Sequence, residues 1–99
     1  VKVIDNAEQS RFELRMRGRV AGFAEYRLRP GAIEFTHTEV DPALRGRGLA
    51  AQLMRHALDA AAAQNLQVTP SCSYVAAYLA KHPEYQGLLD ERQRSALGR

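Results

Sequence analysis

The chain passes from a predicted strand into a predicted helix through a turn rich in glycine and arginine, Val40-Asp41-Pro42-Ala43-Leu44-Arg45-Gly46-Arg47-Gly48-Leu49-Ala50. The two glycines let the backbone approach a ligand closely, and the first turn of a helix offers unpaired N–H groups at the positive end of its dipole. This combination favours a bound pyrophosphate. Arg45 and Arg47 would add charge-assisted hydrogen bonds to phosphate oxygens. A plain strand-to-helix connection with two surface arginines fits the same spacing, so both interpretations stand at this point.

Two familiar phosphate-binding loops do not match this turn. A Walker A loop needs Lys followed by Ser or Thr after its second glycine, where this chain has Leu49 and Ala50. A dinucleotide-binding fingerprint needs a third glycine and an acidic residue about 20 positions further on. The turn therefore predicts an anion site of another kind.

Three strands are predicted before the turn. Residues 12–16 alternate apolar and charged side chains, and Gly18 permits a tight turn into a second strand over residues 20–28. Pro30 and Gly31 supply the chemistry of a second turn, which leads into a third strand over residues 32–40. These segments predict an antiparallel meander.

The third strand carries a candidate site residue. Strict alternation puts Ile33, Phe35, His37 and Glu39 on one face. This arrangement predicts that His37 lies among apolar neighbours.

A long helix is predicted from the turn to about Gln64, with Asn65 as its stop. Its apolar residues recur at helical spacing and predict one face that packs on the sheet. They are Leu49, Ala50, Leu53, Met54, Ala57, Leu58, Ala60 and Ala61.

A short strand and a second helix are predicted after the long helix. The strand covers residues 66–69 and ends at Pro70, and the helix covers residues 74–82, with Ser71 or Ser73 as its cap. The order βββαβα predicts an α/β (α+β) fold with a mixed, mostly antiparallel sheet that contains one parallel pair. We expect a single domain over residues 1–99, with a flexible tail from about residue 90.

Composition limits the function classes. The chain has 99 residues, enough for one ordinary core, and a net charge of +3 with 12 arginines among its 14 basic residues. These are scattered, without the dense stripe of a nucleic-acid binder, so nucleic acid is not the expected partner. The lone Cys72 excludes an intramolecular disulfide, and no apolar stretch approaches the roughly 20 residues that span a bilayer. We expect a cytoplasmic protein without a membrane partner; its oligomeric state is left open.

Several motifs together resemble a known family. The segment from Thr36 to Ala50 contains an Arg-x-x-Gly-x-Ala core and resembles the acetyl-CoA-binding signature of the GNAT N-acetyltransferase superfamily, especially its smallest single-domain branch. The likeness runs from about Gly22 to Leu89. Three further stretches share it in the same order, namely Glu34-Phe35-Thr36-His37-Thr38-Glu39-Val40, Val68-Thr69-Pro70-Ser71-Cys72-Ser73-Tyr74-Val75 and Tyr78-Leu79-Ala80-Lys81-His82-Pro83-Glu84-Tyr85.

The resemblance implies a compact GNAT-like fold whose sheet is splayed open to admit the pantetheine arm of acetyl-CoA. It implies that this cofactor contacts Val40, Leu44, Arg45, Gly46, Arg47, Gly48, Leu49, Ala50, Tyr74 and Tyr78. The two helices that usually shape the acceptor site in this superfamily have no counterpart in the predicted elements. The acceptor is therefore expected only as an amine or a protein.

The resemblance also implies two catalytic residues. Cys72 and His37 match a cysteine and a histidine that lie near the thioester in the smallest branch. Without the resemblance, a lone cysteine is more often a small apolar packing group, and a histidine on a strand face is more often a packed residue with a satisfied hydrogen bond. Three histidines without a compact cluster, with a single cysteine, do not predict a zinc site.

The sequence thus predicts an acetyl-CoA-dependent N-acetyltransferase with an unidentified amine acceptor. Two other functions stay open. One is a module that binds or senses acyl-CoA without turnover, and the other is a small basic adaptor for nucleic acid or protein.

Overall fold

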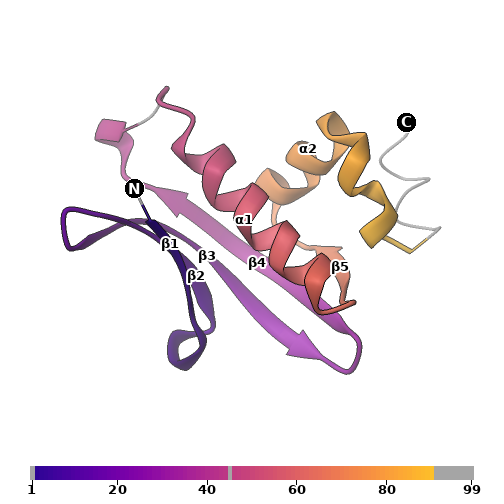
Figure 1. Ribbon diagram of the computed structural model, residues 1–99. Coiled ribbons are helices and arrows are strands. Elements are labelled where there is room, and N and C mark those ends of the chain that lie inside the picture. Colours follow the sequence, from indigo (N-terminus) through magenta and orange to yellow (C-terminus); the bar gives the residue numbers. More distant parts are fainter. Residues whose placement is uncertain (1, 45, 91–99) are drawn as a thin grey trace.

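The computed structural model describes residues 2–44 and 46–90, which form a five-stranded sheet with two α-helices (Figure 1). The strands are β1 (Lys2–Asn6), β2 (Arg11–Met16), β3 (Arg19–Arg29), β4 (Ala32–Val40) and β5 (Gln67–Pro70). The helices are α1 (Leu49–Ala63) and α2 (Ser73–Lys81), and three short 3₁₀ segments are η1 (Ala7–Gln9), η2 (Pro42–Leu44) and η3 (Pro83–Leu88). The predicted tail beyond residue 90 lies outside the described residues.

The predicted mixed sheet is confirmed. Its strands follow the order β1-β2-β3-β4-β5, with antiparallel pairing from β1 to β4 and parallel pairing between β4 and β5. Helix α1 makes the crossover that a parallel pair requires. Strand β1 was not predicted, because this short edge strand is only partly buried and shows little alternation between buried and exposed side chains.

The helix predictions hold with one correction. Helix α1 ends at Ala63, and Asn65 adopts a left-handed conformation (φ 57°) that stops it as expected. The cap of α2 was predicted wrongly, because its N-cap residue is Cys72 and no side chain caps it. The hydroxyl of Ser71 donates instead to Glu34 on β4. Within the described residues, neither helix has the length and apolar character needed to cross a bilayer.

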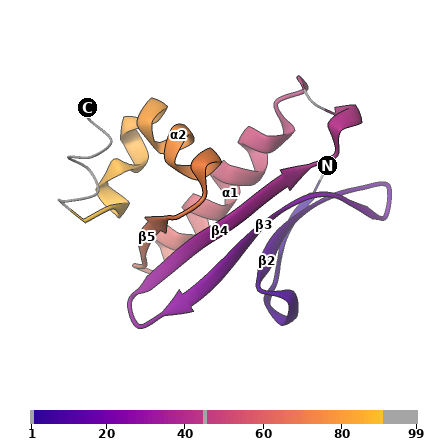
Figure 2. The same cartoon turned by 180° about the vertical axis from the view of Figure 1, so that it is seen from behind.

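The core lies between the sheet and α1, which runs across one face of the strands, while the other face is open (Figures 1 and 2). We call the face that carries α1 the inner face and the opposite one the outer face. The residues with no exposed surface include Leu14, Ala24, Phe35, Leu53, Met54, Ala57, Leu58 and Val68. Each large apolar side chain buried in this way stabilises the fold by about 1.5–3 kcal/mol.

A β-bulge in β4 changes which side chains face the core. Glu25 pairs with His37 and Tyr26 pairs with Phe35, so Thr36 is skipped in the pairing register with β3. One extra residue reverses the alternation beyond it, which sends Thr38 to the inner face and His37 to the outer face. The prediction that His37 shares the face of Phe35 among apolar residues was therefore wrong.

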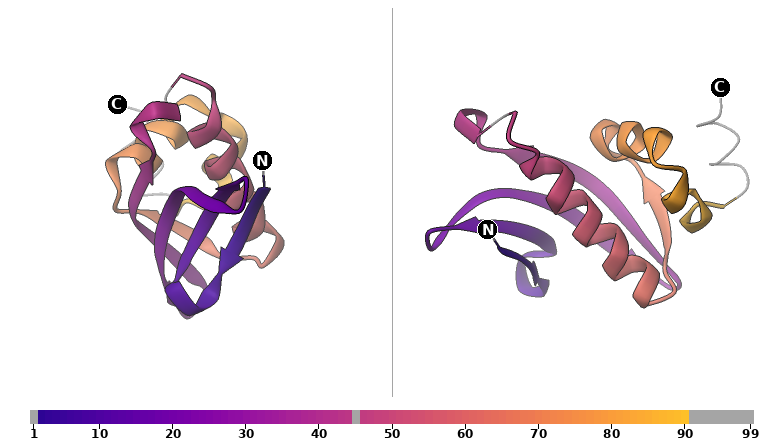
Figure 3. Two further views of the ribbon diagram at one scale, coloured as in Figure 1. Left: turned by 90° about the vertical axis from the view of Figure 1, so that its left-hand side faces the viewer. Right: turned by 45° about the horizontal axis from the view of Figure 1, so that its top comes forward.

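The bulge also separates two halves of β4. Residues 32–35, the paired half, bond to β3 on one side and to β5 on the other. Residues 36–40, the open half, pair only with β3, and the ribbon of β5 ends well short of the far end of β4 (Figure 3). The sheet is thus splayed between β4 and β5.

Candidate functional site

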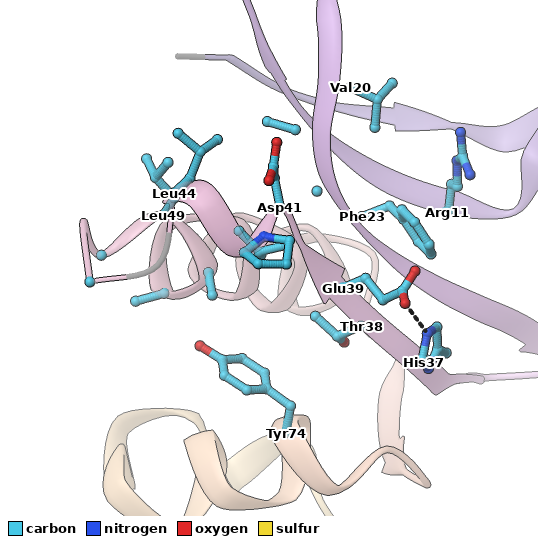
Figure 4. A pocket seen from close by; sticks show the side chains of 18 residues that line it. Arg11, Val20, Phe23, His37, Thr38, Glu39, Asp41, Leu44, Leu49 and Tyr74 are labelled. Carbon is cyan, nitrogen blue, oxygen red and sulfur yellow. Dashed lines mark ion pairs between the residues drawn. The ribbon is translucent and has the colours of Figure 1, made fainter.

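A cleft of about 950 Å³ follows the open half of β4. Where β4 and β5 part, the Cys72 N–H donates a hydrogen bond to the Phe35 carbonyl at 3.0 Å. Beyond that point the cleft is lined by β3, β4, the turn after β4 and the first residues of α1, with Tyr74 of α2 on the far side. Figure 4 shows that Leu44, Leu49 and Tyr74 lie on one side of β4, whereas Phe23 and Arg11 lie on the other.

The turn before α1 exposes helix amides to the cleft. Gly46 (φ 84°) and Gly48 (φ 71°) adopt left-handed conformations that other residues take only with strain, and a Cβ at either would meet no other atom within 4 Å. Gly48 is the N-cap of α1, no side chain caps the helix, and its first turn contains no acidic residue. Asp41 holds the turn by accepting a hydrogen bond from the Ala43 N–H at 3.0 Å. The N–H groups of the first turn are therefore available to an anion.

Most of the predicted cofactor residues line this cleft. They are Val40, Leu44, Gly46, Gly48, Leu49, Ala50 and Tyr74. Arg47 is exposed in the same turn without lining the cleft, and Arg45 lies outside the described residues.

Tyr78 lies away from the cleft. Its ring stacks on that of His82 at 3.8 Å and lies 6.3 Å from that of Tyr85, so the structure places Tyr78 in the packing between α2 and η3. The ring of Tyr74 differs because it is 37% exposed and faces the cleft (Figure 4). Burial nevertheless raises the pKa of the Tyr74 hydroxyl.

Cys72 does not line the cleft itself but contacts a residue that does. It is partly exposed, and its Sγ lies 3.6 Å from the Oγ1 of Thr38, which does line the cleft. Burial alone raises the pKa of the thiol, but the backbone groups of Val75 and Tyr74 and the Thr38 hydroxyl outweigh it, so that the pKa is lowered. A lowered pKa increases the thiolate fraction, which is the nucleophilic form.

His37 lines the cleft from the outer face. Its Nε2 lies 3.5 Å from Oε1 of Glu39, and its ring lies 6.1 Å from that of Phe23. Its side chain is 54% exposed. The contacts described for His37 and for Cys72 involve different neighbours on opposite faces of β4, so the structure does not join the two into a contacting pair.

Several residues of the cleft were not predicted, notably Thr38, Phe23, Arg11 and Glu39. Thr38 and Glu39 could have been found, since they directly follow His37 on a strand that was already predicted. Arg11 and Phe23 reach the cleft only through pairing of β2 with β3 and of β3 with β4, which no local pattern reveals. Among the described residues, no three His, Cys, Asp or Glu side chains gather as metal ligands would.

Comparisons with known proteins identify the family of the chain. The family model of the GCN5-related N-acetyltransferases matches residues 11–88. The chain therefore belongs to this family, and the resemblance recognised in its motifs is confirmed.

Curated relatives carry the name Protein NATD1. The chain is 30% identical to the one from Mus musculus over 86 residues, which cover 84% of this chain and 77% of that protein. It is likewise 30% identical to the one from Homo sapiens, over 84% of this chain and 75% of that protein. The relative from Xenopus tropicalis is 29% identical over 84% of this chain and 78% of its own length.

Proposed function

We propose that this protein is an N-acetyltransferase that takes its acetyl group from acetyl-CoA and transfers it to an amine. The cleft carries the proposal, because it joins an uncapped helix N-terminus to the splayed edge of β4. Membership of the GCN5-related N-acetyltransferase family supports the donor and the reaction class.

The turn before α1 fits the pyrophosphate of CoA. Free amides at the start of α1 would donate to phosphate oxygens, and the open space beside Gly46 and Gly48 would let these oxygens approach the backbone. Arg45 and Arg47 would contribute positive charge from the same turn. No acidic residue in the first turn of α1 opposes that charge.

The open half of β4 fits the pantetheine arm. In a sheet, a strand without a neighbour leaves every second N–H and C=O group unpaired on that side. Residues 36–40 present such an edge to the cleft, and the two amide groups of pantetheine are suitable partners for it. The thioester would then lie near Thr38 and Cys72, where β4 and β5 part.

Acetyl-CoA supplies an activated acetyl thioester to this site. The attacking amine must be neutral, and it loses a proton when its nitrogen bonds to the carbonyl carbon and the carbon–sulfur bond breaks. His37 is the proposed proton acceptor, because it lines the cleft and its side chain is partly exposed beside Glu39. In an alternative route, the Cys72 thiolate attacks the thioester carbonyl and releases the CoA thiolate, and the amine then attacks the acetyl-cysteine, loses its proton and releases the Cys72 thiolate.

Isothermal titration calorimetry with acetyl-CoA, CoA and ATP tests the proposed donor. We expect acetyl-CoA and CoA to bind and ATP to bind poorly. Gly48→Glu should abolish binding, because it places negative charge beside the phosphates. Gly48→Gln has the same backbone strain and bulk without the charge and should retain more affinity. Gly31→Glu is the remote control, since Gly31 has the same φ of 71° in the turn before β4 and also has open space around it. No binding to the unmodified protein would contradict the proposal.

Mass spectrometry after mixing with acetyl-CoA separates the two routes. A mass increase of one acetyl group that is absent in Cys72→Ala indicates an acetylated cysteine. Full transfer activity in Cys72→Ala leaves only direct attack by the amine. Tight binding of acetyl-CoA without transfer to any amine or protein acceptor would mean that the protein is a CoA-binding module and not an enzyme.

A further inference from the structure

The outer face of the sheet contains a buried carboxylate. Glu13 on β2 is 1% exposed and is the one charged residue among the described ones that is buried. Its Oε2 accepts hydrogen bonds from Arg11 Nε at 2.7 Å and Asn6 Nδ2 at 3.1 Å, and its Oε1 accepts from Arg15 at 2.7 Å. Burial raises the pKa of Glu13, but the hydrogen bonds from Arg15, Arg11 and Asn6 outweigh it and lower the pKa. Glu13 is thus a fixed negative charge.

The two arginines on Glu13 have different surroundings. Arg11 is 26% exposed, and its guanidinium lies 4.8 Å from the centre of the Phe23 ring. Arg15 is 43% exposed and makes no described contact with Phe23. Arg11 also lines the cleft, whereas Arg15 does not. A cation held over an aromatic face is attracted to the ring, so Arg11 restrains Phe23 through a contact that Arg15 does not make among the described contacts.

Phe23 passes this restraint to the cleft. Its ring lies 6.1 Å from that of His37 at an angle of 53°, a tilted arrangement that favours a defined position of both rings. His37 is also near Glu39, which pairs with Phe23 across β3 and β4. Figure 4 shows Arg11, Phe23 and His37 along the same side of β4.

We propose that Glu13 and Arg11 are positioning residues, which hold Phe23 and His37 as the outer wall of the cleft. Under the proposed function, an amine that approaches from the open outer face would meet this wall. Neither Glu13 nor Arg11 takes part in a chemical step. Their role is to keep the imidazole of His37 oriented through the Phe23 ring, in addition to the contact of its Nε2 with Glu39.

Aromatic ¹H–¹³C spectra of the full chain test the proposal, with Arg11→Gln and Arg15→Gln as a matched pair. Each variant removes one arginine from Glu13 and leaves the other. If Glu13 and its two arginines only stabilise the fold, both variants should change the ring signals of Phe23 and His37 to the same extent. The positioning role predicts that only Arg11→Gln moves the ring signals of Phe23 and His37, and that Arg11→Lys restores them in part because it keeps the cation. Substitution of His37 by Asn and of Phe23 by Leu assigns the signals.

Equal changes in the two variants, or none in Arg11→Gln, would overturn the proposal. Glu13→Gln should move the same signals as Arg11→Gln, but the arginine pair decides the matter even if this variant fails to fold. Titration of each folded variant with acetyl-CoA is a separate readout. If the unmodified protein does not bind acetyl-CoA, the proposed function is wrong. The ring signals of Phe23 and His37 would still test whether Glu13 and Arg11 position these rings.

Discussion

The two halves of β4 share one strand but have opposite tasks. The paired half has a strand on either side, and its Ile33 and Phe35 are buried beneath α1. The open half has one neighbour, and its His37 and Glu39 side chains are more than half exposed. The first half is part of the core and the second is the wall of a cleft.

Two local changes produce this difference. Thr36, which is skipped in the pairing register with β3, reverses the faces of the strand, and the chain of β5 turns into α2 after Pro70 instead of continuing along β4. A strand end without a neighbour and with polar side chains contributes little to the core. The open half can therefore bind a ligand without loss of core packing, while the paired half fixes the position of the strand.

Truncation of one residue in each half should give the largest contrast in stability. Phe35→Ala leaves a cavity in the core and should lower the free energy of unfolding by about 3–5 kcal/mol. His37→Ala removes an exposed side chain and should change it by no more than about 0.5 kcal/mol. Urea unfolding followed by circular dichroism measures both. Similar losses in the two variants would show that the open half also supports the core.

Neutralisation of the carboxylate beside the open half should have an intermediate effect. Glu13→Gln should cost about 1–3 kcal/mol at neutral pH, towards the lower end because Arg11 and Arg15 are partly exposed to solvent. The folded-state pKa of Glu13 is lowered, so its stabilisation is present above the unfolded-state pKa of about 4.3 and is lost as pH falls through the folded-state value. The stability gap between the two proteins should therefore close at acid pH. A stability difference that does not depend on pH would mean that the packing of the Glu13 side chain, and not its charge, stabilises the fold.

Removal of the hydroxyl beside Cys72 should have the smallest effect. The pKa of this thiol is lowered in part by the Thr38 hydroxyl, so Thr38→Val should raise it and shift alkylation by iodoacetamide to higher pH. Because valine has nearly the shape of threonine, the free energy of unfolding should change little. Alkylation rates between pH 6 and pH 10, compared with those of a cysteine peptide, measure the shift. Unchanged rates in Thr38→Val would mean that the backbone groups of Val75, Tyr74 and Thr38 lower the pKa without the hydroxyl.

Much of the fold could be predicted because its signals are local. Pro30 and Gly31 mark the turn before β4, and the apolar spacing from Leu49 to Ala61 marks the helix that covers the sheet. Strand β1 was missed because an edge strand of five residues has little to distinguish it. The bulge at Thr36 could not be predicted, since it depends on the register with β3, and the orientation of His37 was wrong for that reason alone.

The candidate site also contains residues that local sequence signals reveal and residues that only the strand pairing brings together. The glycine turn was recognised from its own residues, and most of the residues predicted to bind the cofactor line the cleft. Tyr78 was predicted to contact the cofactor, but its ring stacks on that of His82, one helical turn further on, and does not line the cleft. Arg11 and Phe23 are far from the turn in sequence and reach the cleft through two strand pairings.

Hydrogen exchange of the β4 amides with and without acetyl-CoA tests most directly whether the open half is a ligand-binding edge. We predict slower exchange on addition of acetyl-CoA for amides within residues 36–40 that do not bond to β3, and no change for residues 32–35, which are already paired on both sides. Gly48→Glu should abolish the protection, and Gly31→Glu should retain it. Protection spread evenly over both halves, or none in the open half despite binding of acetyl-CoA, would contradict this account.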